Sequence, residues 1–260
     1  MKTSKIAMFA ALVALAFCGT TQAAEWGTIT GKFVVDGKLP AAAAISVTKD
    51  VEFCGKQGLT DETVVVDAKG GLANVAVWVY ISRGKSGPDV HPSYADKAKE
   101  TLVIDNVKCA YSPHFSMATT GQAVEFKNSD GIAHNFKVEG FSNDSFNTLV
   151  PNGAAYQHKF SEEESYPMNA GCSIHPWMNA KILVKESPYM AISAADGTFT
   201  IENMPVGEWK FKLWHEKSGN LSNLDGNTKV ETDRKGIFEI EVKAGTNDLG
   251  VIKVTPEDLE

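Results

Sequence analysis

Short runs of alternating apolar and polar residues recur along the chain at intervals of about ten residues, and no long amphipathic segment separates them. Residues 121–138 read as a strand, a turn and a second strand. Residues 196–216 read as two strands separated by Pro205-Val206-Gly207. The 22 glycines and 10 prolines among 260 residues supply the turns that such strands need. This pattern is typical of β-sandwiches, and it predicts an all-β protein.

The first 24 residues have the organisation of a secretory signal peptide. Lys2 and Lys5 precede an apolar run over residues 6–17, and residues 21–24 end in the small side chains that a signal peptidase accepts. An apolar run of about 12 residues is too short to cross a bilayer, so we expect no membrane span. The sequence therefore predicts an exported protein of the periplasm or the cell surface.

The chain is acidic, with a formal net charge of -7, which becomes -9 when Lys2 and Lys5 leave with the signal peptide. A nucleic acid is an improbable partner for such a chain, because nucleic-acid binding relies on clustered positive charge. The acidic balance instead favours a basic protein partner.

Three cysteines remain after residue 24: Cys54, Cys109 and Cys172. An exported chain seldom leaves spare thiols free, so a disulfide between Cys54 and Cys109 is the simplest interpretation of the odd count. The alternative is a second metal site made by Cys54, Cys109 and His114, since His114 closely follows Cys109.

Residues 172–178, CSIHPWM, carry the most informative chemistry of the chain. Cys172, His175 and Met178 offer a thiolate, an imidazole and a thioether in one turn between two expected strands. A second imidazole, His134, lies 38 residues before Cys172, at the end of an expected strand. One thiolate, two imidazoles and a weak thioether form the donor set of a mononuclear blue-copper site. Zinc is the main alternative metal, but a structural zinc site normally recruits further Cys or His residues in place of Met.

Three segments resemble the cupredoxins of the plastocyanin and amicyanin type: residues 121–135 (GQAVEFKNSDGIAHN), the turn at residues 172–178, and residues 179–185 (NAKILVK). The resemblance covers roughly residues 100–186 and implies a Greek-key β-sandwich with one type 1 copper ion. His134, Cys172 and His175 would then be the equatorial ligands and Met178 the axial ligand. The sequence departs from the family before the cysteine, where Met168 and Ala170 stand in place of aromatic residues.

The same resemblance implies two supporting roles around the metal. The backbone amide of Asn135 would donate a hydrogen bond to the Cys172 sulfur and help to set the reduction potential. The ring edge of His175 would reach the surface within a small apolar patch that includes Trp177 and Ile132. This patch would be the port through which electrons leave.

The flanks of the chain carry a second resemblance. Residues 26–40 (WGTITGKFVVDGKLP), residues 75–81 (VAVWVYI) and residues 196–214 look like parts of a transthyretin-like or carboxypeptidase-regulatory-like β-sandwich. We therefore expect residues 25–95 and 188–260 to form this second sandwich, with the cupredoxin domain inserted at residues 96–187. Insertion is tolerated where domain termini lie close together. Consecutive independent domains are the alternative.

These features predict an exported type 1 copper protein that carries single electrons between redox partners, such as a basic cytochrome and a dehydrogenase or an oxidase. No second copper cluster or nucleophile motif suggests an enzyme. Two other functions stay open: a copper delivery or storage protein, and a surface binding module whose cupredoxin domain is vestigial.

Overall fold

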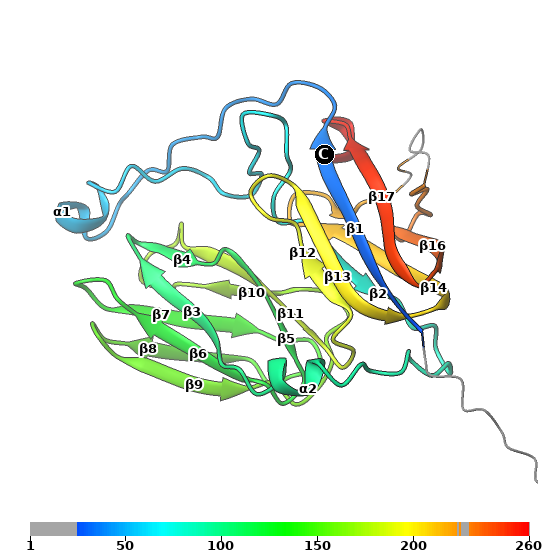
Figure 1. Cartoon of the computed structure of the whole chain (residues 1–260). Helices are drawn as coiled ribbons and strands as arrows, with labels where there is room; N and C mark the ends of the chain where they lie inside the picture. The colour runs from blue at the N-terminus through cyan, green and yellow to red at the C-terminus, as the bar shows by residue number, and fades with distance from the viewer. Residues whose placement is uncertain (1–24, 223, 225–228, 260) are drawn as a thin grey trace, which may run out of the picture.

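The computed structural model describes residues 25–222, 224 and 229–259, and these residues form an all-β protein, as the strand pattern predicts (Figure 1). The expected signal peptide lies outside the described residues. Within the described part of the chain, no helix has the length and apolar character needed to cross a membrane.

Strands from both ends of the described chain build one sandwich, which we call the flanking sandwich. One sheet has the order β13-β1-β17, with β1 parallel to β17 and antiparallel to β13. The other has the order β12-β2-β14-β15, with β16 also paired to β14. The strands are β1 (Trp26–Val35), β2 (Ala76–Val79), β12 (Met190–Ile192), β13 (Thr198–Pro205), β14 (Gly207–His215), β15 (Gly219–Asn220), β16 (Ile237–Val242) and β17 (Gly245–Val254), and the 3-10 helix η1 (Glu257–Leu259) follows them.

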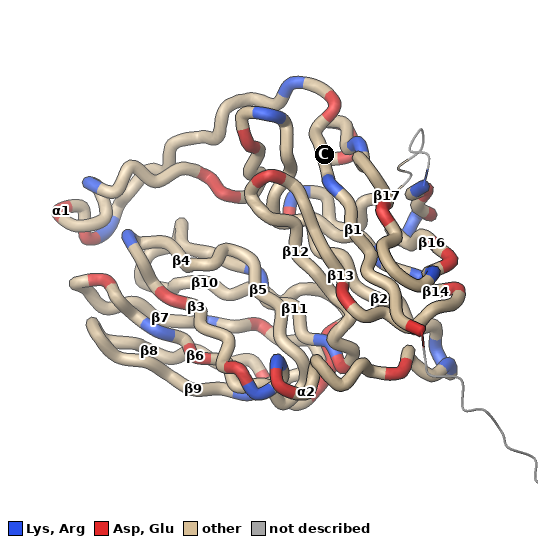
Figure 2. The backbone as a smooth tube through the Cα atoms, in the orientation of Figure 1, with Lys and Arg blue, Asp and Glu red and all other residues tan. Residues whose placement is uncertain are grey.

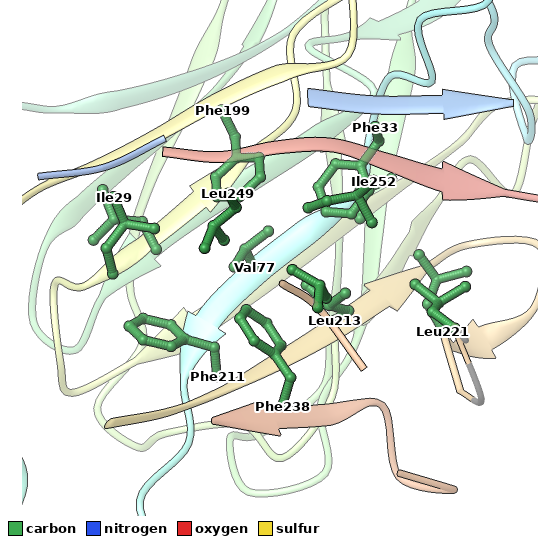
Figure 3. Packing of buried hydrophobic residues seen from close by; sticks show 14 of the residues in the cluster. Ile29, Phe33, Val77, Phe199, Phe211, Leu213, Leu221, Phe238, Leu249 and Ile252 are labelled. Carbon is green, nitrogen blue, oxygen red and sulfur yellow. The ribbon is translucent and has the colours of Figure 1, made fainter. Parts of the chain in front are cut away.

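Apolar side chains from the two sheets meet in the core of the flanking sandwich (Figure 3). Every second residue of β1 is buried, so the alternation read from the sequence places Ile29 and Phe33 in this core. The Phe33 ring stacks on Phe199 of β13, and Phe211 of β14 stacks on Phe238 of β16.

The strands between β2 and β12 build a second sandwich, which we call the inserted sandwich. Its two sheets have the orders β5-β11-β10-β7-β8 and β4-β3-β6-β9. The β3–β6 and β5–β11 pairs are parallel and the other pairs are antiparallel. The strands are β3 (Leu102–Val107), β4 (Ala110–Ser112), β5 (Phe115–Thr119), β6 (Ala123–Asn128), β7 (His134–Glu139), β8 (Phe146–Val150), β9 (Ala155–Lys159), β10 (Met168–Gly171) and β11 (Asn179–Lys185). The short helix α2 (Tyr94–Lys97) precedes β3.

The two sandwiches pack on each other through the sheet that contains β2 and β14. All four residues of β2 are buried, because one face of the strand lines the core of the flanking sandwich and the other faces the inserted sandwich. A run such as VAVWVYI, apolar at successive positions, is what a strand buried on both faces requires. At the interface, the Trp214 ring contacts Phe115 edge to face, beside Trp78 and Leu183.

Residues 41–63 leave the flanking sandwich and lie against the inserted one; we call them the strap. Two antiparallel arms are joined by hydrogen bonds from Ile45 N to Leu59 O and from Asp61 N to Ala43 O. At the tip, helix α1 (Val51–Cys54) lies at the far end of the inserted sandwich (Figure 1). We expected this segment to belong to the flanking sandwich, but its apolar residues pack on the core of the inserted one.

Candidate metal centre

The turn between β6 and β7 is shaped by a buried asparagine. Asn128 Nδ2 donates hydrogen bonds to the carbonyl oxygens of Ile132 and Val150, each at 2.8 Å. Its Oδ1 accepts the backbone N–H of Asp130 at 3.0 Å. The Asn128 side chain is thereby satisfied inside the protein and ties the turn to β8, which helps to place His134 at the start of β7.

The turn that joins β10 to β11 is closed by backbone hydrogen bonds. The Cys172 amide donates to Met178 O at 3.1 Å, and the Met178 amide donates to His175 O at 2.9 Å. The His175 amide also points at Cys172 Sγ, 3.4 Å away. These contacts fold residues 172–178 back on themselves, so the sulfur and the imidazole face the same side.

The two turns bring three of the expected ligands together. His134 Nδ1 lies 2.9 Å from His175 Nδ1, and Cys172 Sγ lies 3.6 Å from His175 Nδ1. The three donor atoms all lie within 4.8 Å of one another, and all three residues are buried. Met178 is also buried and packs in the same cluster as Cys172.

Each histidine uses its other ring nitrogen to bind a carboxylate. His134 Nε2 lies 2.9 Å from Asp130 Oδ2, and His175 Nε2 lies 2.7 Å from Asp50 Oδ2. An ionised carboxylate only accepts hydrogen bonds, so a proton on each Nε2 would leave each Nδ1 with a lone pair to offer a metal ion. Burial lowers the pKa of His134, as does the neighbouring His175, which favours the neutral imidazole that a metal requires. The donor set and its protonation therefore fit a soft, imidazole-binding metal ion such as copper.

Asn135 reaches the sulfur by a different route from the one expected. Its side-chain Oδ1, and not its backbone amide, is the atom near the sulfur: the Cys172 thiol donates to it at 3.2 Å. The same Oδ1 accepts the Ser173 amide at 2.8 Å. The backbone amide that approaches the sulfur belongs to His175. Asn135 thus ties β7 to the ligand turn through its side chain.

The residues expected to form the electron port have unequal exposure. His175 is completely buried, so the expectation that its ring edge reaches the surface is wrong. Asp50 of the strap covers that edge. Trp177 and Ile132 are partly exposed, and the Trp177 ring centroid lies 5.2 Å from that of His175.

Cys54 and Cys109 form a disulfide with an S–S distance of 2.02 Å, as the odd cysteine count suggested. The alternative of a second metal site is therefore wrong, because both sulfurs are bonded to each other. His114 instead lies between Glu216, 2.5 Å from its Nε2, and Glu62, 3.6 Å from its Nδ1. Cys109 also approaches Asp130 and His134, but a disulfide sulfur offers no thiolate to a metal.

The two carboxylates at the histidines are the part of the site that sequence reasoning missed. Asp130 precedes His134 by four residues in the turn, and this proximity was a usable signal. Asp50 precedes His175 by 125 residues and lies in a segment with no metal-binding pattern, so nothing local indicated it.

No protein-family model and no curated protein sequence matches this chain. Among solved structures, an oxidized amicyanin variant is 21% identical, with 33% of this chain and 82% of that chain covered and a TM-score of 0.30. A copper-containing nitrite reductase from Thermus scotoductus SA-01 is 22% identical over 41% of this chain and 25% of that chain, with a TM-score of 0.31. A purple cupredoxin from Nitrosopumilus maritimus is 24% identical over 32% of this chain and 99% of that chain, with a TM-score of 0.28. These similarities concern the fold of part of the chain.

Proposed function

We propose that the protein is an exported cupredoxin that holds one type 1 copper ion and carries single electrons between redox partners. One observation carries the proposal: two imidazole Nδ1 atoms and one thiol sulfur of buried residues converge within 4.8 Å, with each Nε2 held by a carboxylate. His134, Cys172 and His175 would hold the ion, and Met178 would be the weak axial donor.

Copper bound there would supply one-electron exchange between its two oxidation states. The residues around the copper would keep that exchange fast if the positions of the donor atoms change little between the two oxidation states. Cys172 offers a soft sulfur that suits Cu(I), and the two imidazoles suit both oxidation states. The closed turn at residues 172–178 and the carboxylates at each Nε2 fix the donors in place, so little rearrangement accompanies a change of charge.

The proposed partner is a basic redox protein, such as a small cytochrome, or a dehydrogenase or oxidase. The chain carries a net charge of -7, and acidic and basic residues are interspersed along both sandwiches (Figure 2). Net charge would steer a basic partner toward the molecule. Trp177 and Ile132, both partly exposed beside the ligand turns, would form the surface through which electrons pass.

We further propose that residues 25–95 and 188–260, apart from the strap at residues 41–63, form a mount for the inserted cupredoxin, which docks it to a partner or to the cell surface. The sheet membership of the strands supports this division, because every strand from β3 to β11 pairs only within the inserted sandwich. We also propose that the protein is an electron carrier and not an enzyme. Residues 1–24 are proposed to be its export signal.

The test is to load the mature protein with Cu(II) and to record its visible and EPR spectra. We expect one copper ion per chain and an intense thiolate-to-copper charge-transfer band. Cys172→Ala is expected to abolish the band, whereas Met178→Leu keeps it and mainly raises the potential by removing a weak donor. A Cys172→Ala protein that stayed blue would refute the ligand assignment.

Two other outcomes would identify the alternative functions. Copper that passes readily to an acceptor protein while electron exchange is sluggish would identify a delivery or storage protein. A wild-type protein that binds no copper would identify a surface module with a vestigial metal site.

A further inference from the structure

The contact between Asp50 and His175 joins the strap to the ligand turn, and it assigns a role to a residue outside the inserted sandwich. We infer that Asp50 is a positioning residue for His175, so that the strap completes the metal centre. This inference rests on the proposed function, because it concerns how one proposed ligand is held.

Both nitrogen atoms of the His175 ring have a close polar contact. Nδ1 faces His134 Nδ1 and Cys172 Sγ, and Nε2 bonds to Asp50 Oδ2 at 2.7 Å. The ring is completely buried, while the Asp50 side chain is 46% exposed. Asp50 is therefore placed between the ring nitrogen Nε2 and a partly exposed position, where it can fix which nitrogen presents its lone pair to the site.

His134 has a matching contact that shows what such a carboxylate does. Asp130 lies 2.9 Å from His134 Nε2 and is itself held by the backbone amides of Lys108, at 2.6 Å, and Cys109, at 2.7 Å. Both histidines thus have the carboxylate–imidazole arrangement found around metal ligands. The difference is the origin of the carboxylate, since Asp130 is part of the His134 turn and Asp50 comes from the strap.

The local structure of Asp50 supports a role beyond its own helix. Asp50 stands at the N-cap of α1, where an aspartate normally accepts a backbone N–H of the first turn. Its side chain makes no such capping bond, and its carboxylate is aimed at His175 instead. Its backbone is in the left-handed region, with φ 46° and ψ 43°, a conformation uncommon for non-glycine residues and better tolerated by Asp and Asn.

The strap is covalently anchored four residues after Asp50, close to the contact with His175. Cys54, at the end of α1, is bonded to Cys109, whose own amide holds Asp130. The Phe53 ring lies against Gly131 in the His134 turn. The disulfide therefore links the strap segment that carries Asp50 to the residue whose amide holds Asp130.

The test compares Asp50→Ala and Asp50→Asn with a matched control, Glu52→Gln. Asn tolerates the left-handed backbone and keeps an oxygen acceptor but removes the charge, whereas Ala removes both. Glu52 lies in the same helix with its side chain 98% exposed, so the control changes the charge of the strap without touching His175. All variants are made in the full mature chain.

The first readout uses copper-free protein and nitrogen-15 NMR of the histidine rings. We expect His175 to hold its proton on Nε2 in the wild type and in Glu52→Gln, and to lose this preference in Asp50→Ala. The second readout is Cu(II) affinity. Asp50→Ala is expected to weaken binding about 10–100-fold, the usual effect of losing such a partner, with a smaller loss for Asp50→Asn and none for Glu52→Gln.

Equal affinities and an unchanged His175 tautomer across all Asp50 variants would overturn the inference. A wild type that binds no copper would instead refute the proposed function, and the NMR readout would still decide whether Asp50 positions the ring. The two failures are thereby distinguishable.

Discussion

The flanking and inserted sandwiches are built on similar strands but differ in what they bury. The core of the flanking sandwich consists of apolar side chains such as Phe33, Phe211 and Ile252 (Figure 3). The inserted sandwich buries polar groups at one end, among them Asn128, Asp130, Asn135, His134 and His175.

The two regions are therefore ordered by different interactions: apolar burial in the flanking core and hydrogen bonds between buried polar groups at the metal end. Apolar burial needs only the right pattern and volume, and it stabilises a sandwich without specifying any chemistry. Buried polar groups are costly unless each finds a partner, so the metal end is ordered by specific hydrogen bonds. The flanking core thus contributes stability without site chemistry, whereas the metal end carries the candidate site, and substitutions in the two places should have different effects.

The largest expected effect on stability is in the apolar core. Phe211→Ala removes a buried ring that stacks on Phe238, and the cavity should lower the free energy of unfolding by about 3–5 kcal/mol. Urea unfolding measures this loss, and the copper charge-transfer band should keep its position. The control Val251→Ala, at a site 55% exposed, should change stability by less than about 0.5 kcal/mol. A shifted band in Phe211→Ala would show that the two regions are coupled.

The Cys54–Cys109 disulfide links the strap covalently to the metal end of the inserted sandwich. Replacing both Cys54 and Cys109 by Ala opens a link of 55 residues, and the chain-entropy model assigns such a link about 4 kcal/mol. Measured effects are often smaller, so urea unfolding should show a loss of at most this size. Alkylation of the unreduced, copper-free protein should label Cys172 alone. Labelling of Cys54 and Cys109 would contradict the disulfide.

His114 connects the sandwiches electrostatically, through Glu216 directly after β14 and Glu62 of the strap. Burial lowers the pKa of His114, but the hydrogen bond to Glu216 and the nearby negative charge of Glu62 outweigh this effect and raise it to about 9. A histidine whose pKa is raised in the folded state stabilises fully below its unfolded pKa and loses that contribution as pH rises through the folded value.

Unfolding free energies measured from pH 6 to pH 10 should therefore fall by roughly 3 kcal/mol as His114 loses its proton. His114→Gln should be less stable at pH 6 and should remove most of this slope. A slope that persists unchanged in the variant would assign the pH dependence to other groups.

The pattern of the sequence predicted the fold better than it predicted the surroundings of the site. The alternation in β1 and the continuous apolar run of β2 both led to the observed burial, because strand periodicity is a local property. The grouping of Cys172, His175 and Met178 was likewise local. Asp50, the partner of His175, could not be predicted locally, because a single aspartate in the strap has no characteristic spacing and only the tertiary structure brings it to the ring. The burial of the His175 edge was missed for the same reason.

Substitutions at Trp177 should have the smallest effect on stability. They test where electrons leave the metal centre, since the ring edge of His175 is buried. The Trp177 indole donates to Cys109 O at 3.2 Å, so Trp177→Phe should cost only about 1 kcal/mol and keep the charge-transfer band. Trp177→Asp and Ile132→Asp should both slow electron exchange with a small basic cytochrome in stopped-flow experiments, because a charge hinders apolar docking beside the ligand turns. Trp177→Phe should exchange at nearly the wild-type rate, since it retains an apolar ring next to His175. Association should weaken with added salt, as net charge steers the partner. Rates that ignore both Asp substitutions would place the port elsewhere on the surface, away from the two ligand turns.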